Sequence, residues 1–369
     1  MKKILYVTTV SLTLNTFLIP HMNHLIRNGF IVETASNIDV PLSKEFLNLD
    51  INHTKVDFSR NPINPINIKA YREIVKLQRE KQFDIVHVHT PVAAFITRLA
   101  LRNSKVKVVY TAHGFHFYKG APIINWLLYY PLERLAARWT DELLTINKED
   151  LKRAKCFTLR NCGQVYLISG VGIEETKYYI ENFHRNNYRE NLNLKEEEFV
   201  ILVLAELNKN KNHIQIIKAM YLLQKQYPKI KVLFAGRGPL EKKLRKIVEK
   251  LKLNNNIKFI GFRNDIPQLL QSCDCIGLFS YREGLGKCLL EGMLLGKPLI
   301  ATNTRGAREL ICHGDNGFLV ELGDYRELSE YIEKIYKNES LKKHFKENSK
   351  VKITKYTMNN VLKEIINFY

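Results

Sequence analysis

Short runs of aliphatic and β-branched residues alternate with amphipathic stretches along almost the whole chain. The strand-like runs of the first half are KILYVTT, FIVETAS, DIVHVHT, KVVYTAH, ELLTIN and QVYLIS, and those of the second half are FVILVLAEL, KVLFAGRG, IKFIGF, CIGLFS, PLIAT and GFLVE. Such alternation is typical of parallel sheets whose strands are joined by crossover helices. The pattern therefore predicts an α/β protein with two doubly wound, Rossmann-like domains.

The division between the two series falls in a polar stretch rich in Asn, Tyr and charge, SGVGIEETKYYIENFHRNNYRENLNL. We predict a first domain over residues 1–170, a linker with a lead-in helix over 171–195 and a second domain over 196–350. Residues 351–369 contain the amphipathic stretch TMNNVLKEIINFY, which we expect to be a C-terminal helix that crosses back to the first domain. A chain of 369 residues is also long for a single core.

The composition is strongly basic, with 57 Lys and Arg against 37 Asp and Glu and a formal net charge of +20. Nucleic acid, an anionic membrane surface and phosphorylated small molecules are the partners that such a charge favours. The densest segment runs from Arg60 to Lys107, where Arg72, Lys76 and Arg79 share one face of a predicted helix. A nucleic-acid-binding protein is disfavoured, because no reading module is recognisable and the basic residues do not cluster with aromatic ones.

The chain contains no stretch of about 18 apolar residues, so no membrane-spanning helix is predicted. The N-terminal MKKILYVTTV turns polar too soon for a signal peptide and is better explained as a first strand. The six cysteines form no C-x-x-C pair and lie mostly in apolar runs, as expected of reduced thiols. We therefore expect a cytoplasmic protein.

Polar, basic and glycine residues follow four consecutive strands of the second domain. Ligands of doubly wound sheets bind beyond the carboxyl ends of the strands, and helix N-termini there favour phosphate. The residues at these positions are Lys209, Lys211, Gly236, Arg237, Phe262, Arg263, Asn264, Glu283, Gly284, Leu285 and Gly286. They predict a pocket for a phosphate and a base, in which Gly236 allows the backbone to approach closely.

Two glutamates, Glu283 and Glu291, flank the predicted helix start. At 3.6 residues per turn, Glu291 returns near the face of Leu285, and its apolar neighbours indicate a buried setting that an unpaired carboxylate does not tolerate. The alternative is a helix-start acid and a solvated helix face. Because carboxylates accept hydrogen bonds from vicinal hydroxyls, one glutamate near a sugar and one near a ribose would fit a nucleotide sugar.

The stretch SYREGLGKCLLEGMLLGKPLIAT resembles the glutamate–seven-residue–glutamate signature of retaining glycosyltransferase family 4. ELNKNKNHIQIIKAM, AGRGP and GFRNDIPQLLQSCD stand in the order that this family shows. HGFHFYKGAP and YYPLERLAARWTDELLTINKED are similar to a bacterial branch that builds capsular polysaccharide and exopolysaccharide. The resemblance implies the GT-B fold, in which two Rossmann-like domains face a central cleft, the first binding the acceptor and the second mainly the nucleotide sugar.

The resemblance also implies roles for individual residues. Glu291 would hold the ribose hydroxyls, Glu283 a hydroxyl of the transferred sugar, and Lys211 the diphosphate. His113 would point at the donor sugar near the reacting carbon, which makes His113, Lys211 and Glu283 the expected catalytic set. Backbone groups of residues 284–286 would meet the sugar and diphosphate, and Arg237 with residues 262–264 would line the base.

The sequence departs from the family at two places. Glu206 stands where many relatives carry Arg, so Lys209 is the candidate replacement for the missing cation. The loop TTVSLTLN lacks the glycines that many relatives have there, so Ser11, Thr13 or Asn15 must make any contact through side chains. We assign Ser11 and Thr13 to the donor, and Asn15 with His89 to the acceptor.

A metal site at His87 and His89 would need His113 or His116 as a third ligand. We expect neither metal nor cofactor, since transferases of this architecture generally use protein cations and helix dipoles for the leaving diphosphate.

The expected function is retaining transfer of an N-acetylhexosamine or related hexose from a UDP-sugar to a polyprenyl-diphosphate-linked saccharide in cell-surface polysaccharide assembly. The basic segment would attach the protein peripherally to the anionic inner face of the cell membrane. The alternative is a nucleotide-sugar epimerase of the same fold, and a nucleic-acid-binding protein is a distant third.

Overall fold

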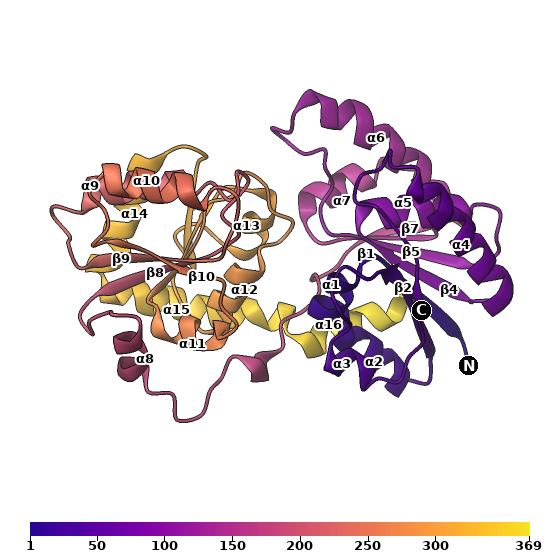
Figure 1. The fold of residues 1–369 in the computed structure, drawn as a ribbon, viewed down its shortest axis with the longest axis horizontal. Coiled ribbons are helices and arrows are strands. Elements are labelled where there is room, and N and C mark those ends of the chain that lie inside the picture. Colours follow the sequence, from indigo (N-terminus) through magenta and orange to yellow (C-terminus); the bar gives the residue numbers. More distant parts are fainter. The chain divides into compact units, whose positions relative to one another are not determined.

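The computed structural model describes all residues, 1–369, and shows two compact units (Figure 1). The first unit consists of Met1–Gly172 and Met358–Tyr369, and the second of Ile173–Thr357. Each unit contains one parallel sheet with helices packed on it, as the alternating pattern predicts.

The sheet of the first unit has the strand order β3-β2-β1-β4-β5-β6-β7, and all pairings are parallel. The chain leaves β1 toward one edge and returns to β4 on the other side, so the switch point lies between the carboxyl ends of these two strands. The strands are β1 (Lys3–Val10), β2 (Ile31–Asn37), β3 (His53–Lys55), β4 (Ile85–His89), β5 (Lys107–Ala112), β6 (Glu142–Thr145) and β7 (Gln164–Leu167).

Helices cover both faces of this sheet, and the central strand β4 is buried along its whole length, as expected when both faces are covered. The helices are α1 (Ser11–Thr13), the π-helix η1 (Leu14–Leu18), α2 (Ile19–Arg27), α3 (Lys44–Leu47), α4 (Ile66–Lys81), α5 (Pro91–Ala100), α6 (Ile123–Ala137), α7 (Lys148–Ala154) and α16 (Met358–Ile365), with short 3₁₀ turns at Arg160–Cys162 and Ile366–Phe368. Gly29, at φ +83°, ends α2 as its position predicts, since its N–H donates to the Ile26 carbonyl.

Our prediction of a loop after the first strand is wrong. Helix α1 begins at Ser11, directly after β1, and continues through η1 into α2. The side chains of Ser11 and Asn15 form hydrogen bonds that hold residues 40–43 against this helix start.

The sheet of the second unit has the order β10-β9-β8-β11-β12-β13 and is also parallel throughout, with its switch point between β8 and β11. The strands are β8 (Phe199–Leu204), β9 (Ile230–Ala235), β10 (Ile257–Gly261), β11 (Cys275–Leu278), β12 (Leu299–Thr302) and β13 (Gly317–Val320). The helices are α8 (Arg185–Asn191), α9 (His213–Leu223), α10 (Glu241–Lys250), α11 (Ile266–Ser272), α12 (Lys287–Leu294), α13 (Arg305–Leu310), α14 (Tyr325–Lys337) and α15 (Glu339–Ile353), with 3₁₀ turns at Glu175–Lys177 and Thr354–Tyr356.

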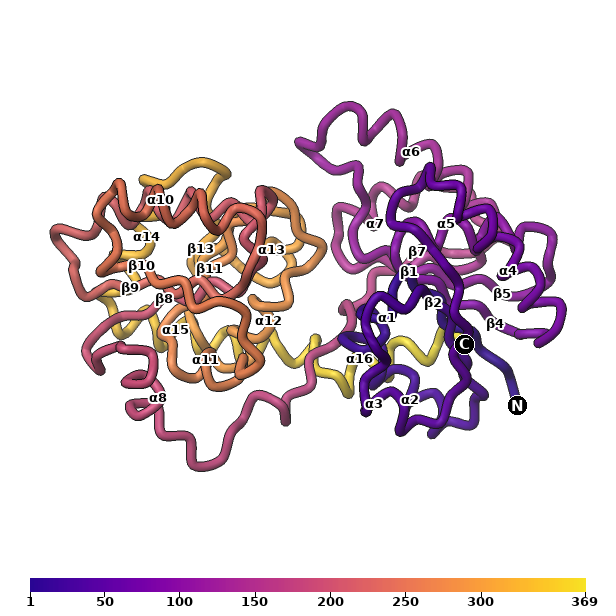
Figure 2. The backbone as a smooth tube through the Cα atoms, viewed as in Figure 1, coloured from indigo at the N-terminus to yellow at the C-terminus, as the bar shows by residue number.

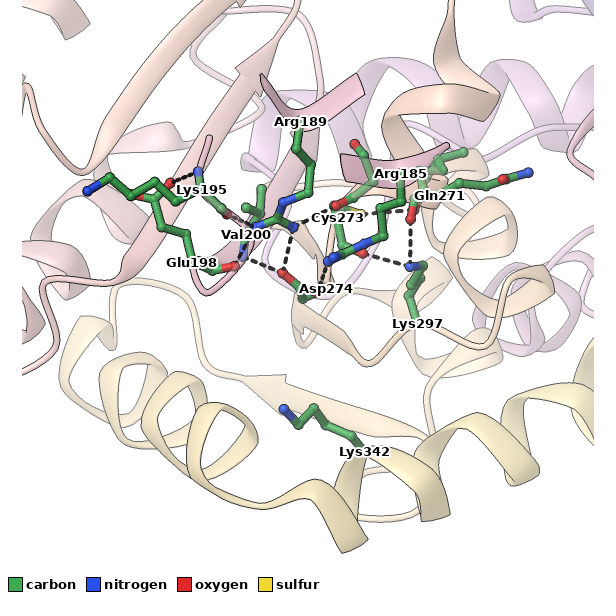
Figure 3. Close-up of polar contacts among 12 residues, drawn as sticks. Arg185, Arg189, Lys195, Glu198, Val200, Gln271, Cys273, Asp274, Lys297 and Lys342 are labelled. Atoms are coloured by element: carbon green, nitrogen blue, oxygen red, sulfur yellow. Dashed lines mark hydrogen bonds and ion pairs between the residues drawn. The ribbon is translucent and has the colours of Figure 1, made fainter. Parts of the chain in front are cut away.

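The segment that we expected to be a linker belongs to the second unit from Ile173 onward. Its helix α8 is fixed by two arginines that converge on Asp274 (Figure 3). Arg185 donates to Asp274 at 2.6 Å, and the fully buried Arg189 donates to the Ser272 carbonyl at 2.8 Å and to Asp274 at 3.3 Å. A buried guanidinium held by several acceptors makes this segment an integral part of the unit.

The boundary between the second unit and the C-terminal segment lies later in the chain than the predicted boundary at residue 350. Helix α15 continues to Ile353 within the second unit, and only Met358–Tyr369 belongs to the first, where the yellow end of the chain lies beside its indigo beginning (Figure 2). Glu364 of α16 accepts from the Ser169 N–H at 3.0 Å, and Lys2 donates to the Tyr369 carbonyl at 2.7 Å. None of the helices is long and apolar enough to cross a membrane.

Candidate active site

An ion pair joins the two strands that flank the switch point of the second unit. Lys211 follows β8, Glu283 follows β11, and the Lys211 Nζ lies 2.6 Å from Glu283 Oε1. Both side chains are largely buried, at 24% and 13% exposure. Burial opposes the charge on Lys211, but the Glu283 carboxylate outweighs it, so the pKa of Lys211 is raised. The structure thus brings together the cation and one of the carboxylates that the sequence predicted.

Backbone and amide contacts hold the two loops that carry this pair. The Asn210 side chain donates to the Arg282 carbonyl at 3.1 Å, and the Tyr281 N–H donates to the Asn210 carbonyl at 2.7 Å. These bonds fix Lys211 against residues 281–283. Lys209, from the same loop, is exposed, and so is Glu206, which also raises the pKa of Lys211.

The second glutamate of the signature, Glu291, is buried within α12, with its side chain 7% exposed. Tyr178 donates a hydrogen bond to its Oε1 at 2.7 Å, and Lys287 lies 3.8 Å from the same atom. Burial raises the pKa of Glu291 against the opposing effects of Lys287 and the Tyr178 hydroxyl. The carboxylate is therefore placed as a buried acceptor in a polar pair, and the solvated-face alternative is wrong for Glu291.

The N-terminus of α12 begins at Gly286, which has φ +94° and offers no side-chain cap. The preceding residues pack against the start of α13, because a Cβ on Gly306 would lie 2.7 Å from the Leu285 nitrogen. Only glycine fits at residue 306, so the 284–286 turn sits directly on the α13 start. Backbone N–H groups at such a helix start favour a phosphate, and the role of Gly284, Leu285 and Gly286 in binding one stays a prediction.

Gly236 serves the fold rather than an open phosphate cradle. A Cβ on Gly236 would lie 2.1 Å from the Ala205 carbonyl oxygen, so the close approach that it allows is to the end of β8. Arg237, the next residue, is exposed.

The three residues after β10 that we predicted to line the base differ in their exposure and in their contacts. Phe262 is 67% exposed, and Asn264 is exposed as well. Arg263 is instead held by both oxygens of Asp265, which also accepts from the Tyr188 hydroxyl at 2.6 Å. Phe262 and Asn264 are thus available to a ligand, whereas the Arg263 guanidinium is already engaged.

In the first unit, His113 is partly buried and lies against the buried ring of His89. Its Nε2 is 3.1 Å from Nδ1 of His89, and the two rings stack with centroids 5.3 Å apart. Burial lowers the pKa of His113 to about 4 and the pKa of His89 well below its usual value, so both rings are neutral at pH 7. A neutral imidazole can donate or accept a hydrogen bond with a sugar hydroxyl.

The neighbouring histidine, His87, is occupied by the fold. Its Nε2 is hydrogen-bonded to Thr111 Oγ1 at 2.8 Å, and its Nδ1 is hydrogen-bonded to the Tyr369 hydroxyl, which also meets Tyr6. The structure contains no group of three or more His, Cys, Asp or Glu side chains arranged to hold a metal ion.

The three polar residues after β1 have different surroundings. Ser11 is buried and donates to the Val40 carbonyl at 2.6 Å, and Asn15 donates to the Pro41 carbonyl at 2.9 Å. Both side chains stabilise the 39–43 segment. Thr13 instead lines a cavity at the carboxyl ends of β1 and β4.

Sequence reasoning missed two residues that shape the second unit's site. Tyr178, the partner of Glu291, lies in the segment that we took for a linker. Gly306, beneath the 284–286 turn, follows β12, and the rule that ligands bind beyond strand ends would have indicated it.

Lys211 and Glu283 pair beyond the ends of two strands, and a turn and the helix α12 with its buried Glu291 follow, so these residues form a candidate ligand site at the switch point of the sheet. Residues 184–352 match the family model described as glycosyl transferases group 1, and residues 3–147 match glycosyl transferase 4-like. The chain is 39% identical over 341 residues to the "Putative glycosyltransferase EpsD" of Bacillus subtilis, covering 91% of this chain and 87% of that protein. The chain therefore belongs to the group 1 glycosyltransferases and is a glycosyltransferase.

A further relative is the UDP-Gal:alpha-D-GlcNAc-diphosphoundecaprenol alpha-1,3-galactosyltransferase of Escherichia coli, 29% identical over 70% of this chain and 67% of that protein. Among solved structures, Anabaena HepE in complex with UDP and glucose superposes with a TM-score of 0.80 at 20% identity, covering 100% of this chain and 99% of that one. The predicted GT-B fold is confirmed.

We expect His113→Ala to lower sugar transfer about tenfold or more, because the side chain predicted to hydrogen-bond the donor sugar is lost. Affinity for UDP should stay unchanged, since the residues predicted to bind the base and the ribose belong to the second unit. Steady-state transfer and calorimetry with UDP measure the two effects, and His184→Ala, an exposed histidine, is the control. Loss of UDP binding in the His113 variant would show that the roles of the units are wrongly assigned.

Proposed function

We propose that the chain is a retaining glycosyltransferase that moves an N-acetylhexosamine or related hexose from a UDP-sugar to a lipid-linked saccharide in cell-surface polysaccharide assembly. The observation that carries this proposal is the Lys211–Glu283 pair at the switch point of the second sheet. The 284–286 turn follows Glu283 directly in the chain and leads into α12, which carries the buried Glu291.

The proposed chemistry uses the pair as a unit. An ammonium has three donors, so Lys211 can keep its bond to Glu283 and also donate to a diphosphate oxygen. Its charge then stabilises the negative charge that develops as the diphosphate leaves, an effect that is large in a site shielded from water. The Glu283 carboxylate remains available on its second oxygen to accept from a sugar hydroxyl, and Lys211 offsets its repulsion of the diphosphate.

Two further observations support the donor and acceptor. The HepE structures contain UDP, glucose or UDP-glucose, which agrees with a UDP-linked donor. The E. coli relative is named for an acceptor that joins a sugar to undecaprenol through a diphosphate. The chain's net charge of +20 suits both an anionic donor and an anionic lipid acceptor.

A donor screen tests the proposal. The purified chain is incubated with a panel of nucleotide sugars, with and without a polyprenyl-diphosphate-linked saccharide, and products are identified by mass spectrometry and by NMR of the anomeric proton. We expect UDP release and acceptor elongation with retained anomeric configuration. Accumulation of an epimerised nucleotide sugar without acceptor would instead identify an epimerase, and an inverted linkage would contradict the retaining mechanism.

We also propose that the basic face of α4 attracts the protein to anionic lipid. Arg72, Lys76 and Arg79 are all exposed on this helix, whereas Ile74 and Leu77 face the core. Each basic side chain near an anionic surface contributes about 1 kcal/mol, in a salt-sensitive way. We predict salt-reversible binding to anionic vesicles.

Substituting Arg72, Lys76 and Arg79 by Glu should abolish this binding in a vesicle sedimentation assay at low salt. The matched control changes Lys242, Lys243 and Lys246 to Glu, since these exposed lysines on α10 give the same change in net charge on the other unit. Equal loss in both triple variants would show that net charge, rather than the α4 face, governs attachment.

A further inference from the structure

A cavity opens at the switch point of the first unit's sheet, and of the residues that line it only Thr13 was assigned to the donor. Its volume is ≈ 350 Å³. It lies where β1 and β4 end and is lined by Thr13, Arg60, Pro62, Thr90, His116 and Tyr129. In open α/β sheets this position is the expected place for a ligand.

The inner part of the cavity is suited to an anion. Thr90 stands at the start of α5 with φ +62°, and no side chain caps that helix, because the Thr90 hydroxyl accepts from the Thr9 N–H instead. The Arg60 side chain is 71% exposed, and its ion pair with Asp39 is long at 3.4 Å. Asp39 is itself engaged by the Ser11 hydroxyl and the Leu12 N–H. A guanidinium, threonine hydroxyls and an uncapped helix start together favour a phosphate group.

The helix that supplies Tyr129 carries an exposed apolar stripe. On α6, Ile123 is 73% exposed and Leu127 is 68% exposed, and Ile124 and Leu128 beside them are also exposed. Large aliphatic side chains gathered in this way mark an interaction surface. Across the cavity lining, Pro62 is followed directly by Ile63, whose side chain is 84% exposed.

The far end of the same α6 face is basic and suits a lipid more than a protein core. Arg134 and Arg138 are exposed about two and three turns beyond Leu127, and the nearby acid Glu133 is turned inward to Arg98 at 2.8 Å. Apolar residues followed by arginines on one helix face match the boundary between acyl chains and anionic headgroups.

We infer that this cavity binds the diphosphate of a polyprenyl diphosphate and that the exposed stripe of α6 contacts the adjoining isoprenoid chain. The inference rests on the proposed function, because it assigns the lipid end of the proposed acceptor. The cavity is too small for the whole lipid, so only the head enters it, and the apolar stripe accounts for the chain outside.

The test compares phosphatidylcholine vesicles that carry polyprenyl diphosphate with phosphatidylcholine vesicles that carry the same negative charge as phosphatidylglycerol, so that general attraction to anionic lipid is equal in both. We expect the wild-type chain to sediment more with the vesicles that carry polyprenyl diphosphate. Arg60→Ala should weaken this binding about tenfold, since a charge-assisted contact to phosphate is lost. Ile124→Ser with Leu127→Ser should weaken it by a similar factor, because two large apolar contacts with the chain are removed.

A short probe separates the two parts of the site. Farnesyl diphosphate in solution should lose affinity in the Arg60 variant and lose much less in the α6 variant. Leu47→Ser, an exposed leucine on α3, and Lys44→Ala on the same helix are the controls. All variants should bind UDP as the wild type does.

Two results would overturn the inference: equal sedimentation with both kinds of vesicle, or equal losses in the control variants. If the wild type transfers sugar to a lipid-linked acceptor while these variants bind polyprenyl diphosphate normally, the inference alone fails. If the wild type elongates only acceptors without lipid, the proposed function fails.

Discussion

Replacing Lys211 by alanine is expected to lower turnover about 10²–10³-fold while the KM for the donor changes little. The reason is that the lysine's charge matters most when the diphosphate departs, and less when the intact donor is bound. Steady-state kinetics with the donor found in the screen, at saturating acceptor, measure both parameters.

The structure shows how to separate charge from hydrogen bonding at this position. Because Lys211 is bonded to the largely buried Glu283, the alanine variant also leaves that carboxylate unpaired. Lys211→Gln retains a donor for Glu283 without the charge, so it should be nearly as slow as the alanine variant. Lys225→Ala, an exposed lysine on the same unit, should be normal. Normal turnover with only a raised KM in Lys211→Gln would contradict the leaving-group role.

Glu291→Ala should weaken UDP binding about a hundredfold or more, because two ribose hydroxyls lose a charged acceptor worth about 1.5–3 kcal/mol for each bond. Calorimetry with UDP measures the loss. Since Glu291 is buried, Glu291→Gln provides a variant of the same shape, and Tyr178→Phe removes the protein's own bond to the carboxylate without removing the charge. Unchanged affinity in a folded Glu291→Gln variant would remove the ribose role.

The raised pKa of Glu291 adds a pH dependence to this prediction. A carboxyl group with a raised pKa becomes protonated at a higher pH than an ordinary glutamate, and the neutral group is a weaker acceptor. UDP affinity in the wild type should therefore fall as the pH drops through this raised pKa. This pH-dependent change in UDP affinity should be absent in Glu291→Gln, because a glutamine side chain does not titrate.

Most of the fold follows from local pattern. All twelve predicted strands are present, because each is an aliphatic run that fits a sheet covered on both faces. Strand β3 was missed since its three residues, HTK, are polar and form no such run. The linker was misassigned for a related reason: the contacts that fix α8 are polar ones from Arg185 and Arg189 to a residue far along the chain, and polarity alone suggested exposure.

The sequence indicated which residues belong to the candidate site, but not which of them contact one another. Strand ends and the resemblance indicated Lys211, Glu283 and Glu291, whereas the bond between the first two joins residues 72 positions apart and depends on the strand order. The sequence also did not show that Gly236 and Arg263 make contacts within the fold. These contacts depend on the Ala205 carbonyl beside Gly236 and the Asp265 carboxylate beside Arg263.

The return of α16 to the first unit has a consequence for the order of events during synthesis. Residues 1–172 leave the ribosome first, yet their unit is completed only by Met358–Tyr369, which are made after the entire second unit. Domains generally fold as units and begin during translation. The second unit can therefore finish before the first, and until α16 arrives the surface that receives it, including the Tyr6 and His87 partners of Tyr369, stays uncovered in the nascent chain. A released chain that ends at Thr357 should accordingly show a protease-resistant second unit and a protease-sensitive first one.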